Sequence, residues 1–207
     1  MEIREYGDRA AQIVLIQPID RLDAASAEKE YDMIRKMTDR NFMLRTYAVD
    51  SWNDDLSPWE APAVFGNEGF AGKAEETLRE IEKDCRGEGK AYLIGGYSLA
   101  GLFALWSACG TDVFSGVAAA SPSVWFPGFA DYLVSNEIRS KSIYLSLGDK
   151  EAKTRNPVMS TVADRIREAY CLFQNRNKKC ILEWNEGNHF REPDLRTAKA
   201  FAWLLNN

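Results

Sequence analysis

The stretch that decides the fold is Leu93-Ile94-Gly95-Gly96-Tyr97-Ser98-Leu99-Ala100-Gly101-Leu102. Its first half is a run of apolar and small residues typical of a buried strand, and its second half has the apolar spacing of a helix. A strand and a helix can approach closely across so short a turn only where small residues flank it. Gly96 and Ala100 stand two positions either side of Ser98. The turn therefore predicts that the Ser98 hydroxyl projects outward from the end of a strand.

This turn resembles the nucleophile elbow, a strained strand-to-helix turn with the usual pattern Gly-x-Ser-x-Gly. In this chain Ala100 holds the last position of the pattern, and a glycine follows one residue later at Gly101. The alternative interpretation is a glycine-rich turn whose serine has no chemical role. The two interpretations differ in what they require elsewhere, because a serine hydroxyl needs a nearby base, and the base needs an acidic residue to orient it.

Strand-like runs alternate with helical patterns on both sides of the turn. The predicted strands cover residues 12–16, 42–49, 91–95, 116–120, 142–147 and 180–184. Apolar residues at helical spacing are Tyr31, Ile34 and Met37; Ala74, Leu78 and Ile81; Leu102, Leu105 and Trp106; and Val158, Val162, Ile166, Ala169 and Phe173. This alternation predicts one α/β domain over residues 1–207, a three-layer α/β/α sandwich with a mostly parallel sheet of about six to seven strands. Residues 1–6 are expected to add an antiparallel edge strand.

Two helix starts and one short connection complete the predicted fold. Asn156 before Pro157 predicts an N-cap with proline at the first helical position, and Asp194 is expected to cap a closing helix that runs to Leu205. Only about twenty residues separate the predicted strands 116–120 and 142–147, where many relatives of this architecture insert a helical cap domain. The sequence therefore predicts a fold without a large cap domain.

Ligands of open parallel sheets bind beyond the carboxyl ends of the strands, so the predicted strand exits are the places to search for chemistry. These exits are residues 17–18, 50–59, 97–98, 121–126, 148–151 and 185–189. The last of them ends in His189, the one histidine of the chain. A lone histidine is by default an incidental residue. Its place at the same sheet edge as Ser98 favours His189 as the base for the serine.

The acidic partner is expected after the preceding strand, where Leu147-Gly148-Asp149-Lys150-Glu151 supplies two carboxylates. The chain order serine, acid, histidine is then satisfied. Glu151, three residues after Gly148, is favoured as the acid, and Asp149 is the alternative. The other carboxylate would be an ordinary solvated charge of the loop.

With these motifs in place, the chain resembles the α/β-hydrolases of the putative-esterase group, and is similar to esterase D and enterochelin-esterase-like proteins. The resemblance is carried by residues 96–101, by Gly148-x-x-Glu151 and by Gly187-Asn188-His189. It covers nearly the whole chain. The resemblance implies a mostly parallel sheet, a Ser-His-acid triad, and neither a metal nor an organic cofactor. It leaves the substrate open, because this scaffold hosts many chemistries.

Acyl transfer also needs backbone N–H groups that bind the negative oxygen of the tetrahedral intermediate. In this type of fold one donor is the amide after the nucleophile, which is Leu99 here. The second is expected at the first strand exit, where Gln17 is the candidate because Pro18 has no N–H group. Aromatic residues at the exits are expected to line a substrate pocket: Trp52, Trp59, Tyr97, Trp125 and Phe126.

The amino-acid composition limits the classes of molecule that this protein is expected to bind. The chain has 207 residues, with 26 Lys and Arg against 31 Asp and Glu, a formal net charge of -5. This balance gives no electrostatic basis for binding nucleic acid or an anionic membrane, and favours a small uncharged or cationic substrate. No apolar run approaches the length of a membrane span, and the four cysteines are scattered, so a cytoplasmic protein without disulfides or zinc is expected. A homodimer is compatible with this size, although no segment marks an interface.

The leading functional prediction is hydrolysis of a carboxylic ester of a small molecule through an acyl-serine intermediate. A thioesterase or an acyltransferase would use the same residues, because these enzymes differ in the leaving group or in how water is excluded. A rival from another class is a non-catalytic member of the fold that only binds a ligand. The reaction of Ser98 with a serine-directed phosphonate would discriminate between these classes.

Overall fold

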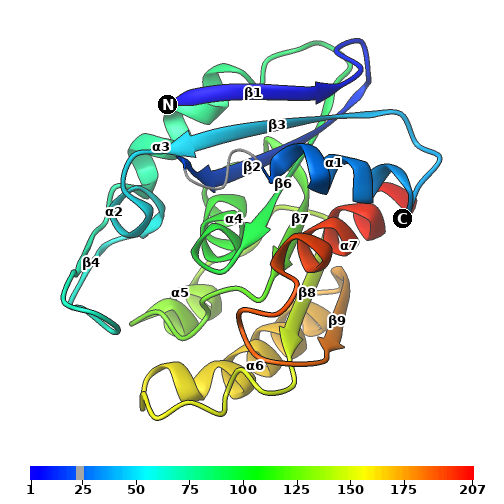
Figure 1. Cartoon of the computed structure of the whole chain (residues 1–207). Helices are drawn as coiled ribbons and strands as arrows, with labels where there is room; N and C mark the ends of the chain where they lie inside the picture. Colours follow the sequence, from blue (N-terminus) through cyan, green and yellow to red (C-terminus); the bar gives the residue numbers. More distant parts are fainter. Residues whose placement is uncertain (22–25) are drawn as a thin grey trace.

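The computed structural model describes residues 1–21 and 26–207. Its main sheet has seven strands (Figure 1). They are β1 (Glu2–Gly7), β2 (Ile13–Asp20), β3 (Phe42–Val49), β6 (Ala91–Tyr97), β7 (Phe114–Ala120), β8 (Ser142–Gly148) and β9 (Lys179–Asn185). Their order in the sheet is β1-β3-β2-β6-β7-β8-β9, and all neighbours are parallel except β1, which is antiparallel to β3. The predicted mostly parallel sheet with an antiparallel edge strand is confirmed.

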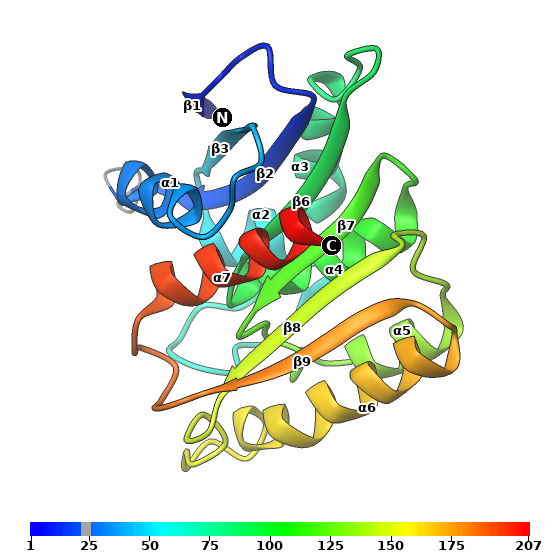
Figure 2. The ribbon, with the colours of Figure 1, turned by 90° about the vertical axis from the view of Figure 1, so that its right-hand side faces the viewer.

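Helices cover both faces of this sheet (Figure 2). On one face, α1 (Ala27–Arg35) packs against α7 (Pro193–Asn206). The other face carries α2 (Trp52–Leu56), α3 (Ala74–Lys83), α4 (Leu99–Gly110), α5 (Phe129–Ser135) and α6 (Val162–Asn175). Each layer has its own buried apolar cluster against the sheet, as the apolar spacing of the helices predicts.

The connections at the sheet edge are short. A two-stranded hairpin of β4 (Glu60–Ala61) and β5 (Phe70–Ala71) lies between α2 and α3, and only α5 separates β7 from β8. The fold therefore has no cap domain in the part of the chain that the structure describes. None of the helices formed by residues 1–21 and 26–207 combines the length and the apolar character needed to cross a bilayer.

The strand β2 is longer than its sequence pattern predicts. Gln17 and Pro18 were expected to begin an exit loop, but the strand continues to Asp20 along β3. Pairing with β6 does end at Ile16, which lies opposite Ile94. Proline is tolerated inside a strand where one side has no ladder to complete, and β2 has that open side at Pro18.

The helix after Pro157 begins later than predicted. The Asn156 side chain accepts hydrogen bonds from the N–H groups of Val158 and Met159, at 3.0 and 3.1 Å, as an N-cap does. The residues that follow form a short 3-10 helix, η2 (Met159–Thr161), and α6 begins at Val162. The cap therefore starts a tighter turn, which the α-helix then continues.

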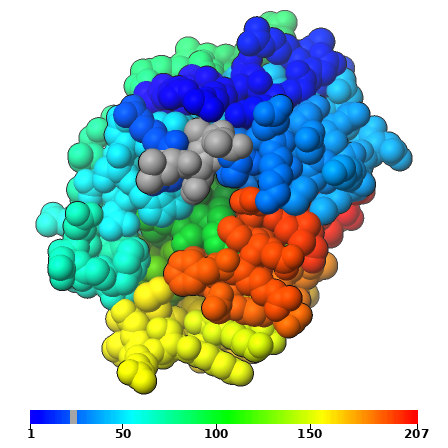
Figure 3. Space-filling view, viewed as in Figure 1, coloured from blue at the N-terminus to red at the C-terminus, as the bar shows by residue number. Residues whose placement is uncertain are grey.

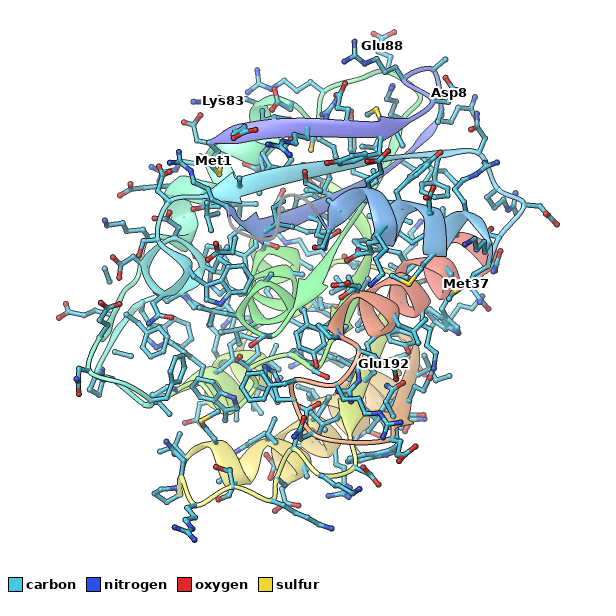
Figure 4. The ribbon with its side chains drawn as sticks, in the orientation of Figure 1. Met1, Asp8, Met37, Lys83, Glu88 and Glu192 are labelled. Carbon is cyan, nitrogen blue, oxygen red and sulfur yellow. The ribbon has the colours of Figure 1, made fainter. Side chains whose placement is uncertain are left out.

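The expected N-cap of the closing helix is also wrong. Glu192, which is labelled in Figure 4, holds the N-cap position of α7 with φ 53°. Pro193 is the first helical residue, and Asp194 lies in the first turn. Proline fixes this start because its φ suits the first helical position and its missing N–H is not needed there.

Candidate active site

Ser98 occupies a strained turn between β6 and α4. Its backbone angles are φ 56° and ψ -118°, a conformation that non-glycine residues rarely adopt. The Ser98 N–H donates to the carbonyl of Ala120 at 3.1 Å, which ties the turn to the next strand. A Cβ built on Gly96 would lie 2.6 Å from the Cβ of Ala100, so the small residue is required for steric reasons. This is the geometry that the sequence predicts for an outward-facing serine.

The loop between β9 and α7 places His189 between Ser98 and Glu151. His189 Nε2 lies 3.0 Å from Ser98 Oγ, and His189 Nδ1 lies 2.7 Å from Glu151 Oε2. Both distances fall within the range of a nucleophile bonded to its base and a base bonded to its orienting acid. A proton on Nδ1 pairs with the carboxylate, and Nε2 is then the acceptor for the serine proton.

Asp149, the alternative acid, lies in the same loop but has a different partner. Its Oδ1 accepts the N–H of Gly187 at 2.7 Å, and its own N–H donates to Asn185 O at 2.8 Å. Gly187 has φ 104°, a conformation that suits glycine. Asp149 therefore fastens the histidine loop to the end of β8, while Glu151 reaches the ring of His189.

The electrostatic environment of Glu151 favours its charged form. Its side chain is only 3% exposed. Burial alone would raise the pKa of Glu151, but the hydrogen bond and charge of His189, with the N–H of Gly148 and the hydroxyl of Ser121, hold that pKa below its usual value. Glu151 is therefore an anion that can stabilise a positive imidazole ring.

Arg196 of α7 is a buried member of the site that the sequence interpretation missed. It is 2% exposed, and its Nη1 donates to Glu151 Oε1 at 2.8 Å and to the hydroxyls of Tyr97 and Ser121 at 3.1 Å each. Its Nη2 donates at 3.1 Å to the carbonyls of Glu186 and Asn188 in the histidine loop. The available signal was its position, since Arg196, Ala200 and Leu204 share one face of a helix whose other members on that face are apolar.

Tyr97 and Ser121 complete the hydrogen-bond network around the acid. The Tyr97 hydroxyl donates to the carbonyl of His189 at 2.7 Å, and burial raises the pKa of Tyr97. The Ser121 hydroxyl donates to Glu151 Oε1 at 2.7 Å from a backbone with φ 44°. The acid and the histidine loop are thus held by neighbouring strand ends as well as by their own loops.

A cavity of about 510 Å³ lies beside His189. Of the aromatic residues expected in a pocket, Tyr97 and Trp52 line it. Trp59 and Phe126 do not line this cavity, because their rings pack against each other with centroids 5.7 Å apart. Trp125 is 8% exposed and borders a separate small hollow that His189 also lines. Figure 3 shows the green segment near residue 100 between cyan atoms near residue 50 and orange atoms near residue 190.

The two expected oxyanion donors lie in different settings. Leu99 is the first residue of α4, so its N–H has no partner within the helix and adjoins Ser98. Gln17 lies in β2, and its side chain donates from Nε2 to Glu30 Oε2 at 3.2 Å. Both assignments as oxyanion donors stay predictions. Among the described residues, no group of three or more His, Cys, Asp or Glu is arranged to hold a metal ion.

Comparison with family models and with curated proteins gives no match. Solved structures do match. An IroE-like serine hydrolase from Shewanella oneidensis is 15% identical, with a TM-score of 0.73 over 99% of this chain and 75% of that one. A ferulic acid esterase is 16% identical (TM-score 0.59; 96% of this chain, 86% of that one). Enterochelin esterase from Shigella flexneri is 15% identical (TM-score 0.64; 97% and 53%). With its sheet order, its strained serine turn and these structural neighbours, the chain has the α/β-hydrolase fold.

Proposed function

We propose that the protein is a serine hydrolase that cleaves a carboxylic ester of a small substrate. The observation that carries the proposal is the hydrogen-bonded series from Ser98 Oγ through His189 to Glu151, with distances of 3.0 and 2.7 Å. Solved structures with the same fold include proteins named as serine hydrolases and esterases, which supports ester hydrolysis in general.

In the proposed first step, Ser98 Oγ attacks the acyl carbon while His189 Nε2 takes the hydroxyl proton. Glu151 stabilises the resulting imidazolium through the bond to Nδ1. The carbonyl oxygen becomes negative and is bound by the N–H groups of Leu99 and Gln17 in this proposal. The tetrahedral species then collapses, the bond to the alcohol oxygen breaks, and His189 protonates that oxygen as the alcohol leaves.

In the second step water replaces the alcohol. His189 takes a proton from water, the hydroxide attacks the acyl carbon, and the bond to Ser98 Oγ breaks as the serine regains its proton from His189. The products are a carboxylic acid and the free enzyme. The cavity beside His189, lined by Trp52 and Tyr97, is the proposed place for part of the substrate.

The test combines labelling with turnover. Purified protein is incubated with a fluorophosphonate probe and with p-nitrophenyl acetate and butyrate, and the adduct is mapped by mass spectrometry. We expect one adduct, on Ser98. Ser98→Ala and His189→Ala should lower kcat by a factor on the order of 10⁴ or more, because the nucleophile and its base act as a unit.

Glu151 and Asp149 lie in the same loop, so their amide variants can be compared directly. Glu151→Gln should lower kcat strongly, since a neutral amide no longer stabilises the imidazolium, whereas Asp149→Asn should change it far less. A protein that neither labels nor turns over any ester would contradict the proposed function and favour a ligand-binding role. Equal losses for Asp149→Asn and Glu151→Gln would contradict the assignment of Glu151.

A further inference from the structure

Two of the residues that line the cavity beside His189 each carry a buried acceptor atom without a partner. Glu30 of α1 is 4% exposed and Gln17 of β2 is 6% exposed, and both residues line the cavity. The amide nitrogen of Gln17 donates to Glu30 Oε2, which leaves Glu30 Oε1 and Gln17 Oε1 buried with no hydrogen-bond partner. Buried polar atoms are nearly always paired, so two unpaired acceptors at the wall of a cavity point to a ligand that donates hydrogen bonds.

The charge of the cavity is negative. Asp20 and Asp194 line it together with Glu30, and none of the described lining residues is Lys or Arg. Cations do contact residues of the lining, since the exposed Lys29 Nζ lies 3.4 Å from Asp194 Oδ2. The buried Arg196 Nη1, which is paired with Glu151, lies 3.1 Å from the Tyr97 hydroxyl. Three further lining residues are aromatic: Trp52, Tyr97 and Phe190. Carboxylates and aromatic faces together are the groups that bind organic cations.

Burial, with a smaller contribution from the charge of Asp194, raises the pKa of Glu30 to about 8, although the hydrogen bond from Gln17 opposes the shift. A pKa of about 8 favours the protonated form of Glu30 at neutral pH. A cation bound against Glu30 would favour the carboxylate and replace this proton, as a nearby opposite charge does for any buried acid.

We propose that this cavity is the subsite for a primary ammonium group of a cationic ester. An ammonium group carries three donors and no acceptor, so it can bond Glu30 Oε1 and Gln17 Oε1 together. A hydroxyl has a single proton to donate and can satisfy both groups only while Glu30 stays protonated, whereas the positive charge of an ammonium group also suits Asp20 and Asp194 in the same cavity. The proposal rests on the proposed ester hydrolysis for the position of the scissile bond, and on the cavity alone for the binding of the cation.

The first test is a series of three acetates that differ only at the far end of the alcohol: 5-aminopentyl, 5-hydroxypentyl and hexyl acetate. Acetate release gives kcat/KM for each. We expect the ammonium ester to exceed the hexyl ester by at least about tenfold, with the hydroxyl ester between them. Glu30→Gln, which keeps the shape and removes the charge, should reduce this ratio several-fold. Glu28→Gln, the same change at an exposed position of the same helix, should keep the wild-type ratio.

The second test measures binding without catalysis. Calorimetry of the wild-type protein with pentylammonium chloride, in two buffers of different protonation enthalpy, should give binding with release of protons, and pentanol should bind more weakly. This measurement does not depend on the folding of any variant. It also separates the cation site from the reaction, because the ligand has no ester.

The outcomes separate the two proposals. Proton-releasing binding of pentylammonium without turnover of any ester would support the subsite and overturn the proposed function. Turnover of all three acetates at equal rates, without binding of pentylammonium, would overturn the subsite and leave the esterase proposal in place. A preference for the hydroxyl ester over the ammonium ester would also overturn the cation site and assign the cavity to hydroxyl-bearing substrates.

Discussion

The guanidinium of Arg196 binds the acid and the histidine loop at the same time. One nitrogen contacts Glu151 Oε1, and the other contacts the carbonyls of Glu186 and Asn188, so a single side chain fixes the distance between Glu151 and His189. Only arginine has the planar set of donors that this arrangement uses. Arg196 is therefore a positioning residue, acting on the chemistry through Glu151 and His189.

Replacement of Arg196 by lysine should separate its charge from its geometry. Arg196→Lys keeps a cation near Glu151 but loses bonds to the loop carbonyls, so we expect kcat for p-nitrophenyl acetate to fall about tenfold with little change in KM. Arg196→Met should in addition lower the free energy of unfolding by about 3 kcal/mol, because it leaves the Glu151 carboxylate buried without its cation.

The control for Arg196 is Arg167→Lys, an exposed arginine on α6 that stacks over the ring of Trp184. It should behave as the wild type in kinetics and lose no more than about 1 kcal/mol of stability in urea denaturation, the value of an exposed cation–π contact. If Arg196→Lys instead raised KM and left kcat unchanged, Arg196 would act on substrate binding, and the positioning role would be wrong.

At the residue scale, the sequence predicts the residue types but not every contact. Ser98, His189 and the loop from Gly148 to Glu151 follow from motif and strand order. The choice between Asp149 and Glu151 depends on the turn at Gly187, whose N–H draws Asp149 away from the ring. The turn at Gly187 has no local sequence signature, and the apolar spacing of α7 indicates that Arg196 is buried but not what it contacts, since both depend on loops that meet only in the folded sheet.

At the element scale, the junction of β6 and α4 depends on small residues that touch across the turn. A Cβ at position 96 would lie 2.6 Å from the Cβ of Ala100. We expect Gly96→Ala to destabilise the protein by about 1–3 kcal/mol, as overpacking does. Ala100→Gly alone should cost about 1 kcal/mol from helix propensity.

The double variant Gly96→Ala/Ala100→Gly should recover part of the loss of Gly96→Ala, because the added methyl then occupies the space of the removed one. Urea denaturation of the four proteins gives the coupling energy between the two positions. If the two changes in the free energy of unfolding were strictly additive, residues 96 and 100 would not be in steric contact across the turn.

The elements themselves were largely predictable, and the exceptions have physical causes. The alternation of strand and helix patterns predicts the parallel sheet, and β3 has the predicted bounds. β2 runs past its predicted end because β3 offers it a partner up to Asp20. A pattern read along one strand has no information on how far its neighbour extends. The start of α7 differs because Pro193, and not Asp194, determines the first turn.

At the scale of the whole molecule, the cavity is assembled from segments far apart in the chain. Glu30 of α1 meets Gln17 of β2 through a hydrogen bond, and the lining also includes His189, Phe190, Pro193, Asp194 and Thr197 from the C-terminal part of the chain. The sequence predicts that aromatic residues gather at this edge, but the ring of Trp59 packs against Phe126 and Tyr132 instead. Side-chain directions at the edge depend on the packing of the loops, which strand exits alone do not determine.

The buried acid of this cavity should also make the stability of the protein depend on pH. Glu30 has an ordinary pKa of 4.5 in the unfolded chain and a pKa of about 8 in the folded protein. Between these values the folded state holds a proton that the unfolded state has lost. The free energy of unfolding should therefore decrease as pH rises through this range, by up to about 1.4 kcal/mol per pH unit from this group.

Glu30→Gln has no proton to lose, so its stability relative to the wild type should increase between pH 5.5 and pH 7.5. Urea denaturation at pH 5.5, 6.5 and 7.5 measures this difference, and Glu28→Gln, an exposed change of the same kind, should parallel the wild type. A difference between Glu30→Gln and wild type that stays constant with pH would show that Glu30 is ionised in the folded protein throughout. Pentylammonium chloride should flatten the wild-type profile, because a ligand that replaces the proton of Glu30 removes the linkage between that proton and folding.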